Sequence, residues 1–444
     1  MTHLRELQNI ADANDGNRAF GSPGYQRSVD YVVNALRGKG FEVETPEFKV
    51  RNYDSEKPTL TVAGNNVTAN ALEFSPGTPP AGVRGPLLAV PAGDAPGCEV
   101  ADYDGLGVRG AIALIGRGGC PFGEKQAIAA RLGAVAAVIA NNDDDDVLHG
   151  ALYRDNDVRL PVVAVSKKDA ARMRANPGPV SLTLQATTTE LTGHNVIAQT
   201  RTGSPHDVVV VGAHLDSVPE GPGINDNGSG VAAVLEVALQ MSSSPPIRQA
   251  VRFAFWGAEE LGLDGSRNYI EALTADQLQD IALYLNFDMV ASPNPGYFTY
   301  DGDQSTPPGD DQSVPRVPDG SAGIERTLTD YLADQGITAQ DTSFDGRSDY
   351  DAFTRAGIPS GGLFAGAEEI MTAEQAKLWD GIANQPFDPH YHQSTDSLAN
   401  ISAKALDIQG RAVGYVVGHY AQDLSGRNGM PARPDRVRHR IPEG

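Results

Sequence analysis

Residues 208–230 read VVVVGAHLDSVPEGPGINDNGSG, and this stretch decides the fold. It opens with a run of valines, and a continuous β-branched run is typical of a strand buried on both faces. His214 and Asp216 follow at the carboxyl end of that strand, where open α/β sheets place their functional sites. Asp226 comes after a loop rich in Gly and Pro, and residues 229–241 then have the pattern of a helix. The stretch therefore predicts a strand, a functional loop and a helix of an α/β fold.

The same sequence of an apolar run followed by acidic residues occurs twice more along the chain. Residues 252–256 precede Glu259 and Glu260, and residues 282–287 precede Asp288. A single acidic residue in a loop is usually only solvated. Three successive apolar strands that each end in a carboxylate or an imidazole are improbable by chance, so we interpret them as one site.

The residue types in this set indicate a pair of zinc ions. Two zinc ions about 3.5 Å apart need a bridging carboxylate, and each ion needs a terminal imidazole and a terminal carboxylate. A further histidine, His392, lies in the stretch DPHYHQ at 388–393. With it the chain supplies that complement with none left over: His214, Asp226, Glu260, Asp288 and His392.

Two further acidic residues fit supporting roles. A carboxylate that is not a ligand must take the proton of the activated water, and Glu259, beside Glu260, is the natural base. Asp216, two residues beyond His214, is expected to accept the other imidazole N–H and so fix the tautomer. The alternative for Asp216 is a plain cap at the strand end.

Five motifs carry a resemblance to a known family: His-x-Asp-Ser at 214–217, Asn-Asp-Asn-Gly-Ser-Gly at 225–230, Glu-Glu at 259–260, Asn-Phe-Asp-Met at 286–289 and Tyr-His at 391–392. In this order they resemble the secreted co-catalytic zinc aminopeptidases of peptidase clan MH. The similarity continues through GRSDYDAF at 346–353, AGIPSGGLF at 356–364 and Asn-Ile at 400–401. It covers roughly residues 190–425 and is highly specific.

The resemblance implies a fold and a ligand arrangement. The fold is α/β, a three-layer zinc exopeptidase core around a mixed sheet. One zinc ion would be held by His214 and Asp288, and the other by Glu260 and His392. Asp226 would bridge the two ions. The peptide bond after this aspartate is cis in relatives.

The resemblance also implies residues that act on the substrate. Glu259 matches the general base, and Tyr391 matches the hydroxyl group that stabilises the oxyanion. An apolar pocket near Ile358 and Phe364 is expected to prefer leucine-like side chains, with Arg347 shaping the same pocket through its backbone.

The chain departs from the family pattern at two places. His390 and Thr395 stand where relatives often carry two bridged cysteines, so the loop of Tyr391 must be braced differently. We expect His390 to be a surface or supporting residue, and a third imidazole near the metals is the alternative. Lys404 stands where calcium-binding relatives carry an acid, which leaves calcium binding open.

The segment before the core has a different composition. Between residues 59 and 187 the chain is rich in Gly, Pro and Val, which predicts short strands broken by turns, with one helix at 123–132. The stretches Gly-Cys at 97–98, GAIALI at 110–115, RGGCPF at 117–122 and GAVAAVI at 133–139 resemble the protease-associated domain often inserted into this peptidase class. The resemblance implies a lid or access role, and a plain spacer is the alternative.

The chain has two cysteines, Cys98 and Cys120, both inside this segment. An even pair within a small secreted β domain indicates a disulfide, and the matching family cysteines are commonly bridged.

We expect four parts in the chain. Residues 1–56 belong to the peptidase domain, with helices at 3–13 and 25–39 and an alternating strand at 41–50. Residues 57–188 form the protease-associated domain, and residues 189–425 complete the catalytic domain. Residues 426–444 carry five arginines among prolines and are expected to be a flexible, poorly ordered tail.

Composition excludes several classes of protein. The formal net charge of −22 disfavours binding to nucleic acid or to an anionic membrane. No apolar stretch is long enough to cross a bilayer, and the N-terminus leads straight into an amphipathic helix without a signal peptide. We expect the mature, monomeric form of a secreted enzyme, with an intracellular enzyme as the alternative. The acidic run at 143–146 is expected to be a solvated loop, with a calcium site as the alternative.

The predicted function is a metallo-aminopeptidase that releases N-terminal residues from peptides or proteins with a free N-terminus. Three rivals remain: a carboxypeptidase or dipeptidase with the same ligands, a glutaminyl cyclase-type acyltransferase with a single zinc, and a non-enzymatic receptor module. The complete ligand set argues against the last of these.

Overall fold

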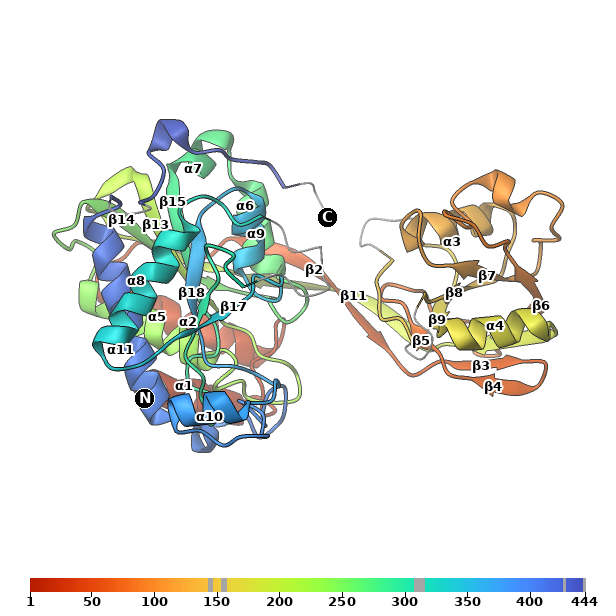
Figure 1. The fold of residues 1–444 in the computed structure, drawn as a ribbon, viewed down its shortest axis with the longest axis horizontal. Helices are drawn as coiled ribbons and strands as arrows, with labels where there is room; N and C mark the ends of the chain where they lie inside the picture. Colours follow the sequence, from red (N-terminus) through yellow and green to blue (C-terminus); the bar gives the residue numbers. More distant parts are fainter. Residues whose placement is uncertain (143–146, 153–157, 307–315, 426–428, 442–444) are drawn as a thin grey trace. The chain divides into compact units, whose positions relative to one another are not determined.

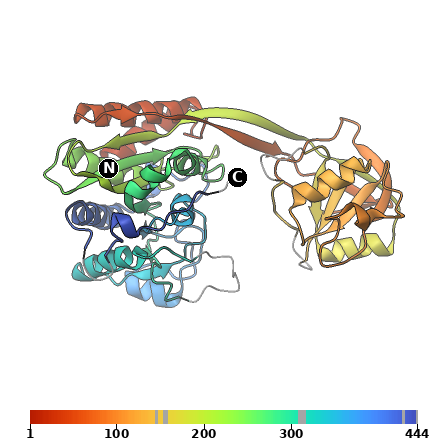
Figure 2. The same cartoon turned by 90° about the horizontal axis from the view of Figure 1, so that it is seen from above.

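The computed structural model describes residues 1–142, 147–152, 158–306, 316–425 and 429–441, and it divides the chain into two compact units (Figure 1). The first unit contains Met1–Val50 and Leu191–Glu443, and the second contains Arg51–Glu190. The chain leaves the first unit along β2 (Glu47–Ser55) and returns along β11 (Ala186–His194), which pair in a two-stranded sheet (Figure 2). The acidic run at 143–146 lies outside the described residues.

The first unit is built on an eight-stranded mixed sheet in the order β1-β12-β14-β13-β15-β18-β16-β17. These strands are β1 (Val43–Glu44), β12 (Val196–Gln199), β13 (Ser204–His214), β14 (Gln249–Trp256), β15 (Ile281–Phe287), β16 (Phe298–Tyr300), β17 (Gln340–Thr342) and β18 (Ser360–Phe364). The central strand β13 runs parallel to β14 and β15, and β15 runs parallel to β18. The three strands predicted around the acidic residues are therefore confirmed as parallel neighbours.

Both faces of β13 are buried, which explains its uninterrupted valines. Val209 and Val211 belong to one hydrophobic cluster, whereas Val208 and Val210 belong to another on the opposite face. Because successive side chains of a strand point to opposite faces, each valine contributes to one of two cores.

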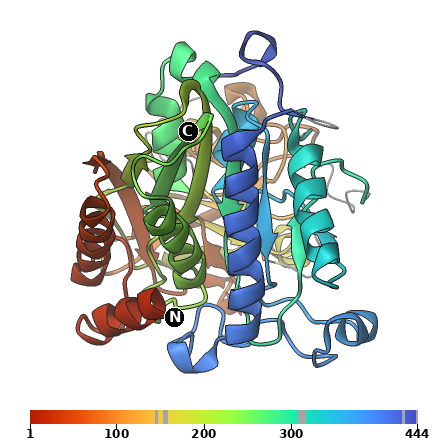
Figure 3. The same cartoon turned by 90° about the vertical axis from the view of Figure 1, so that its left-hand side faces the viewer.

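Helices cover the two faces and complete three layers. One face carries α1 (Thr2–Asp12), α2 (Pro23–Gly38), α5 (Gly228–Met241), α8 (Ser321–Asp334) and α11 (Ala403–Gln422). The other face carries α6 (Asp264–Ala272), α7 (Ala275–Asp280) and α9 (Tyr350–Arg355), and α10 (Ala373–Trp379) lies in a later loop. Figure 3 shows α11, in blue, running between α5 and α8. Among the described residues, none of the helices combines the length and the apolar character that crossing a bilayer requires.

The second unit is a smaller sheet with helices on both faces. Its strand order is β4-β3-β10-β6-β7-β8-β9-β5. The strands are β3 (Thr59–Val62), β4 (Asn65–Val67), β5 (Asn70–Ala71), β6 (Val83–Ala89), β7 (Ile112–Gly116), β8 (Ala136–Ala140), β9 (Val162–Val165) and β10 (Pro179–Thr183). The predicted helix is confirmed as α3 (Phe122–Arg131), and the predicted disulfide joins Cys98 to Cys120.

A second helix of this unit, α4 (Lys167–Ala175), was not predicted. Its sequence KKDAARMRA buries only Ala170 and Met173, so its apolar stripe is too narrow to give a helical pattern.

The prediction of a poorly ordered C-terminal tail is wrong for residues 429–441. Arg436 is 4% exposed and donates to the main-chain oxygens of His206 and Gln279 and to the carboxylate of Asp207. Arg438 donates to main-chain oxygens at the end of α7 and the start of β15. A segment rich in Arg and Pro is typical of a disordered tail, but here carbonyl groups of the first unit bind its arginines.

Candidate metal centre

The parallel strands bring the predicted ligands to one edge of the sheet. His214 is the last residue of β13 and is paired in register with Trp256, the last residue of β14. Glu260 follows β14, and Asp288 directly follows β15. Because the carboxyl ends of parallel strands meet at the same edge, residues far apart in the sequence become neighbours.

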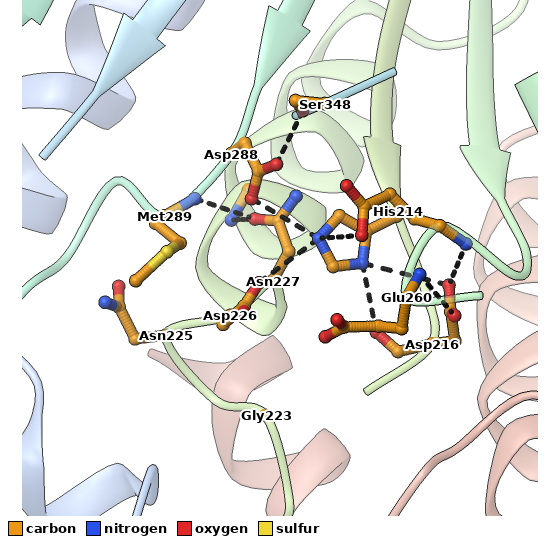
Figure 4. A network of polar contacts seen from close by, with 12 residues as sticks. His214, Asp216, Gly223, Asn225, Asp226, Asn227, Glu260, Asp288, Met289 and Ser348 are labelled. Carbon is orange, nitrogen blue, oxygen red and sulfur yellow. Dashed lines mark hydrogen bonds and ion pairs between the residues drawn. The ribbon is translucent and has the colours of Figure 1, made fainter. Parts of the chain in front are cut away.

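Asp226 lies between two groups of ligands. Its Oδ1 is 3.2 Å from Nε2 of His214, which is also 3.3 Å from Oδ1 of Asp288. Its Oδ2 is 3.2 Å from Nε2 of His392, which is also 3.1 Å from Oε2 of Glu260. Figure 4 shows the carboxylates of Asp226 and Asp288 directed toward the His214 imidazole. The arrangement offers two adjacent groups of three ligands that share one carboxylate.

The donor set fits divalent cations. Oε1 of Glu260 is buried and has no hydrogen-bond donor among the described residues, so a cation is the natural partner for it. Burial and the charge of Asp226 raise the pKa of Glu260 to about 7. Burial disfavours the charged form of His392, but its hydrogen bonds to Asp226 and Glu260 raise its pKa to about 10. Crowded, buried carboxylates of this kind are stabilised by a local positive charge, and zinc accepts imidazole and carboxylate ligands together.

Glu259 and Tyr391 line the cavity beside these ligands, in a space of about 320 Å³. Glu259 is 9% exposed, and its Oε2 lies 3.9 Å from Nε2 of His214. Burial, together with the charges of Glu260 and Asp288, raises the pKa of Glu259 well above its usual value, although His214 opposes this. Both residues therefore face the space that a substrate would enter.

The carboxylate of Asp216 has a different contact from the expected one. Nδ1 of His214 lies 3.1 Å from the main-chain oxygen of Asp216 and 3.8 Å from its carboxylate. The carboxylate instead accepts the main-chain N–H groups of Glu259 at 3.2 Å and Glu260 at 3.3 Å. Asp216 thus fixes the histidine through its backbone and the two glutamates through its side chain.

The residues expected at the substrate pocket do not all lie together. Arg347 and Phe364 line the cavity, but Ile358 is fully buried in the hydrophobic cluster on the opposite face of the sheet from α5 and α11. Apolar character alone does not distinguish a core residue from a pocket residue. The side chain of Arg347 also reaches the rim, where it donates to Glu368 at 2.9 Å and to the Tyr391 hydroxyl at 3.4 Å.

The loop of Tyr391 is braced by the two residues that stand where relatives carry cysteines. Nδ1 of His390 lies 2.8 Å from Oγ1 of Thr395, and the main-chain N–H of His390 donates to Asp388. His390 belongs to none of the groups that could hold a metal within the described residues. A hydrogen bond thus occupies the position of the missing disulfide.

Several residues of the site were not predicted. Ser348 donates to Oδ2 of Asp288 at 2.6 Å (Figure 4), and the carboxylate of Asp396 accepts main-chain N–H groups of the loop that carries Asp226. The peptide bond between Asp226 and Asn227 is cis, as the resemblance implies. Hydroxyl and carboxylate groups that support a loop have no characteristic spacing, so the sequence gives no signal for them.

The chain is similar in sequence and in fold to known aminopeptidases. A mycobacterial protein named as a probable lipoprotein aminopeptidase, LpqL of Mycobacterium tuberculosis (strain ATCC 25618 / H37Rv), is 62% identical over 441 residues, covering 99% of this chain and 88% of its own. Leucine aminopeptidase 2 of Trichophyton tonsurans is 38% identical, with 98% of this chain and 85% of its own covered. The solved structure of BSAP, a zinc aminopeptidase from Bacillus subtilis, is similar with a TM-score of 0.60 at 26% identity, covering 96% of each chain.

Two family profiles match the chain itself. The PA domain matches residues 83–173, within the second unit, and peptidase family M28 matches residues 195–417, within the first. The chain therefore belongs to peptidase family M28 and carries an inserted PA domain.

Proposed function

We propose that the protein removes large apolar residues from the free N-terminus of peptides at a centre of two zinc ions, held by His214, Asp226, Glu260, Asp288 and His392. Its family and its aminopeptidase relatives make it a zinc-dependent aminopeptidase. One observation carries the two-ion assignment. The two carboxylate oxygens of Asp226 lie 3.2 Å from two different imidazoles, which is the arrangement that a bridging ligand requires.

Bound zinc ions would polarise the scissile carbonyl group and lower the pKa of a nearby water molecule. The Glu259 carboxylate accepts a proton from the attacking water and passes it to the leaving amine. The Tyr391 hydroxyl group donates a hydrogen bond to the oxyanion that forms. Glu259 and Asp288 provide negative charge for the free α-amino group of the substrate, which explains why an acetylated N-terminus would bind poorly.

The preference for apolar side chains is supported by the wall of the cavity. Leu263, Met289 and Phe364 line it together with Tyr300 and Tyr350. These side chains offer an apolar surface to the residue that is removed. A relative named as a leucine aminopeptidase supports the same preference.

We further propose that the protein acts outside the cytoplasm, as a monomer, on peptides and not on nucleic acids or membranes. The disulfide between Cys98 and Cys120 supports an oxidising compartment. The net charge of −22 supports the exclusion of nucleic acid.

The proposal is tested with leucyl-p-nitroanilide and its N-acetylated form. We expect cleavage of the free-amine substrate only, loss of activity on chelation, recovery with zinc, and two zinc ions per chain. Glu259→Gln should lower kcat by about 10²- to 10⁴-fold without loss of zinc. The exposed Glu374→Gln is the matched control.

Cleavage of the acetylated substrate would point to another exopeptidase specificity. Stoichiometry of a single zinc would contradict the two-ion centre.

A further inference from the structure

Arg18 is a fully buried cation that contacts the loop between His214 and Asp226. It lies between α1 and α2 and is 0% exposed. Its guanidinium group donates to three main-chain oxygens: Pro222 at 2.9 Å, Gly223 at 2.6 Å, and Leu215. No carboxylate of the described residues forms an ion pair with Arg18. Burying a charge without a counter-ion costs free energy, which indicates that the buried Arg18 has a role that offsets this cost.

The three acceptors belong to one segment, residues 215–226, which we call the metal loop. It joins two proposed zinc ligands, because His214 precedes it and Asp226 ends it. Its start is also tied to the backbone of Arg18, since the Ser217 hydroxyl accepts the Arg18 N–H at 2.9 Å and the Ser217 N–H donates to the Arg18 oxygen at 3.3 Å. Arg18 therefore contacts the metal loop at its start, at Leu215 and Ser217, and again at Pro222 and Gly223, shortly before Asp226.

Asp396 binds main-chain N–H groups of the same loop, whereas Arg18 binds its carbonyl groups. Its carboxylate accepts the main-chain N–H groups of Asn225 at 2.7 Å and Asp226 at 3.0 Å, and its main-chain oxygen accepts that of Ile224 at 3.2 Å. Carbonyl groups of the metal loop thus point to a cation and its N–H groups to an anion. The backbone conformation that presents Asp226 is fixed from both sides.

The charge of Arg18 faces the acidic ligands at longer range. Burial lowers its pKa to about 10, and the carboxylates of Asp216, Asp396, Asp226 and Glu260 oppose that shift, so the side chain stays charged at neutral pH. A permanent positive charge beneath crowded carboxylates reduces their mutual repulsion.

We propose that Arg18 is a positioning residue of the zinc centre, which orients the metal loop so that His214 and Asp226 are preorganised for the ions. The inference rests on the proposed two-zinc site. Arg18 lies outside the segment that matches the peptidase family, residues 195–417. The N-terminal segment therefore contributes to the centre without providing a ligand.

The test compares Arg18→Met and Arg18→Lys with Arg27→Met, which changes an arginine on α2 whose side chain is 70% exposed. In each full-length protein we would measure zinc per chain, zinc affinity by competition with a chelator, the visible spectrum of the cobalt-loaded form, and thermal unfolding of the metal-free form. Arg18→Met should weaken zinc binding about 10- to 100-fold and change the cobalt spectrum. Arg18→Lys should recover part of the affinity, and Arg27→Met should match the wild type.

The outcomes separate this inference from the proposed function. Wild-type zinc affinity and an unchanged cobalt spectrum in both Arg18 variants would overturn it, whatever their unfolding temperatures. If Arg18→Met does not fold, Arg18→Lys decides, because it keeps the charge but not the three-pronged set of donors, so that wild-type zinc affinity in this variant would overturn the inference. A wild-type protein that binds no zinc would overturn the proposed centre itself and this inference with it.

Discussion

Tyr391 illustrates how one hydroxyl group is poised by its neighbours. It lines the cavity, and Arg347 donates to its oxygen, which leaves the hydroxyl hydrogen free to point elsewhere. Burial, together with Asp226 and Glu260, raises the pKa of Tyr391, so it remains a donor. We predict that Tyr391→Phe lowers kcat about 10²- to 10³-fold, because it removes one donor to the oxyanion. Steady-state kinetics with a zinc assay check this, and loss of zinc in the variant would contradict the assigned role.

Substitutions of Ile358 and Phe364 should have different effects, the first on the stability of the protein and the second on its substrate preference. Ile358→Ala should destabilise the protein by about 2–5 kcal/mol, since it opens a cavity in a fully buried cluster. It should leave the ratio of kcat/KM for leucyl and alanyl substrates unchanged. Phe364→Ala should lower that ratio, because Phe364 lines the cavity. Denaturant unfolding and kinetics on the two substrates measure both effects, and a changed ratio for Ile358→Ala would restore it to the pocket.

Single residues can be predicted from the sequence where a metal-binding residue type stands at the end of a recognisable strand. The proximity of His214, Glu260 and Asp288 was predictable because each stands at or just beyond the carboxyl end of an apolar strand. Arg18 and Asp396 were not, because they act through the backbone of a loop and are far from it in the sequence. Only the folded chain brings them together.

At the scale of the element, the C-terminal segment was mispredicted. It contains η3 (Arg433–Asp435) and the buried Arg436, which donates to carbonyl groups of β13 and α7. Composition gives the number of arginines in a segment, but it does not show whether the folded chain places carbonyl acceptors beside them. The strands were easier to predict. A strand such as β13, which is buried on both faces, needs apolar side chains at successive positions, and its run of valines shows this in the sequence.

We predict that Arg436→Ala destabilises the first unit by about 3 kcal/mol, because it leaves buried carbonyl groups and Asp207 without their donor. The exposed Arg440→Ala should change stability by less than about 0.5 kcal/mol. Urea unfolding followed by tryptophan fluorescence checks the pair, since both tryptophans, Trp256 and Trp379, lie in the first unit. Equal effects of the two variants would argue for a tail without a structural role.

For the whole molecule, removal of zinc should affect the two units unequally. All five proposed ligands lie in the first unit, and the disulfide lies in the second. Zinc at 1,000 times its dissociation constant should stabilise the first unit by about 4 kcal/mol, a contribution that a chelator abolishes. Calorimetry of the full chain, with and without chelator, should show a lower unfolding temperature for the first unit only. An equal shift for both units would mean that they unfold together.

The inserted arrangement also sets an order of events during synthesis. The second unit is complete once Glu190 has been made, whereas the first needs α11 near the end of the chain. Arg18 and its acceptor Pro222 are 204 residues apart. At about 5–20 residues per second, Arg18 waits roughly 10–40 s on the ribosome for the loop that it binds. The N-terminal helices α1 and α2 thus spend that time without α5, which both of them contact, and the first unit is completed only after all of the second has been made.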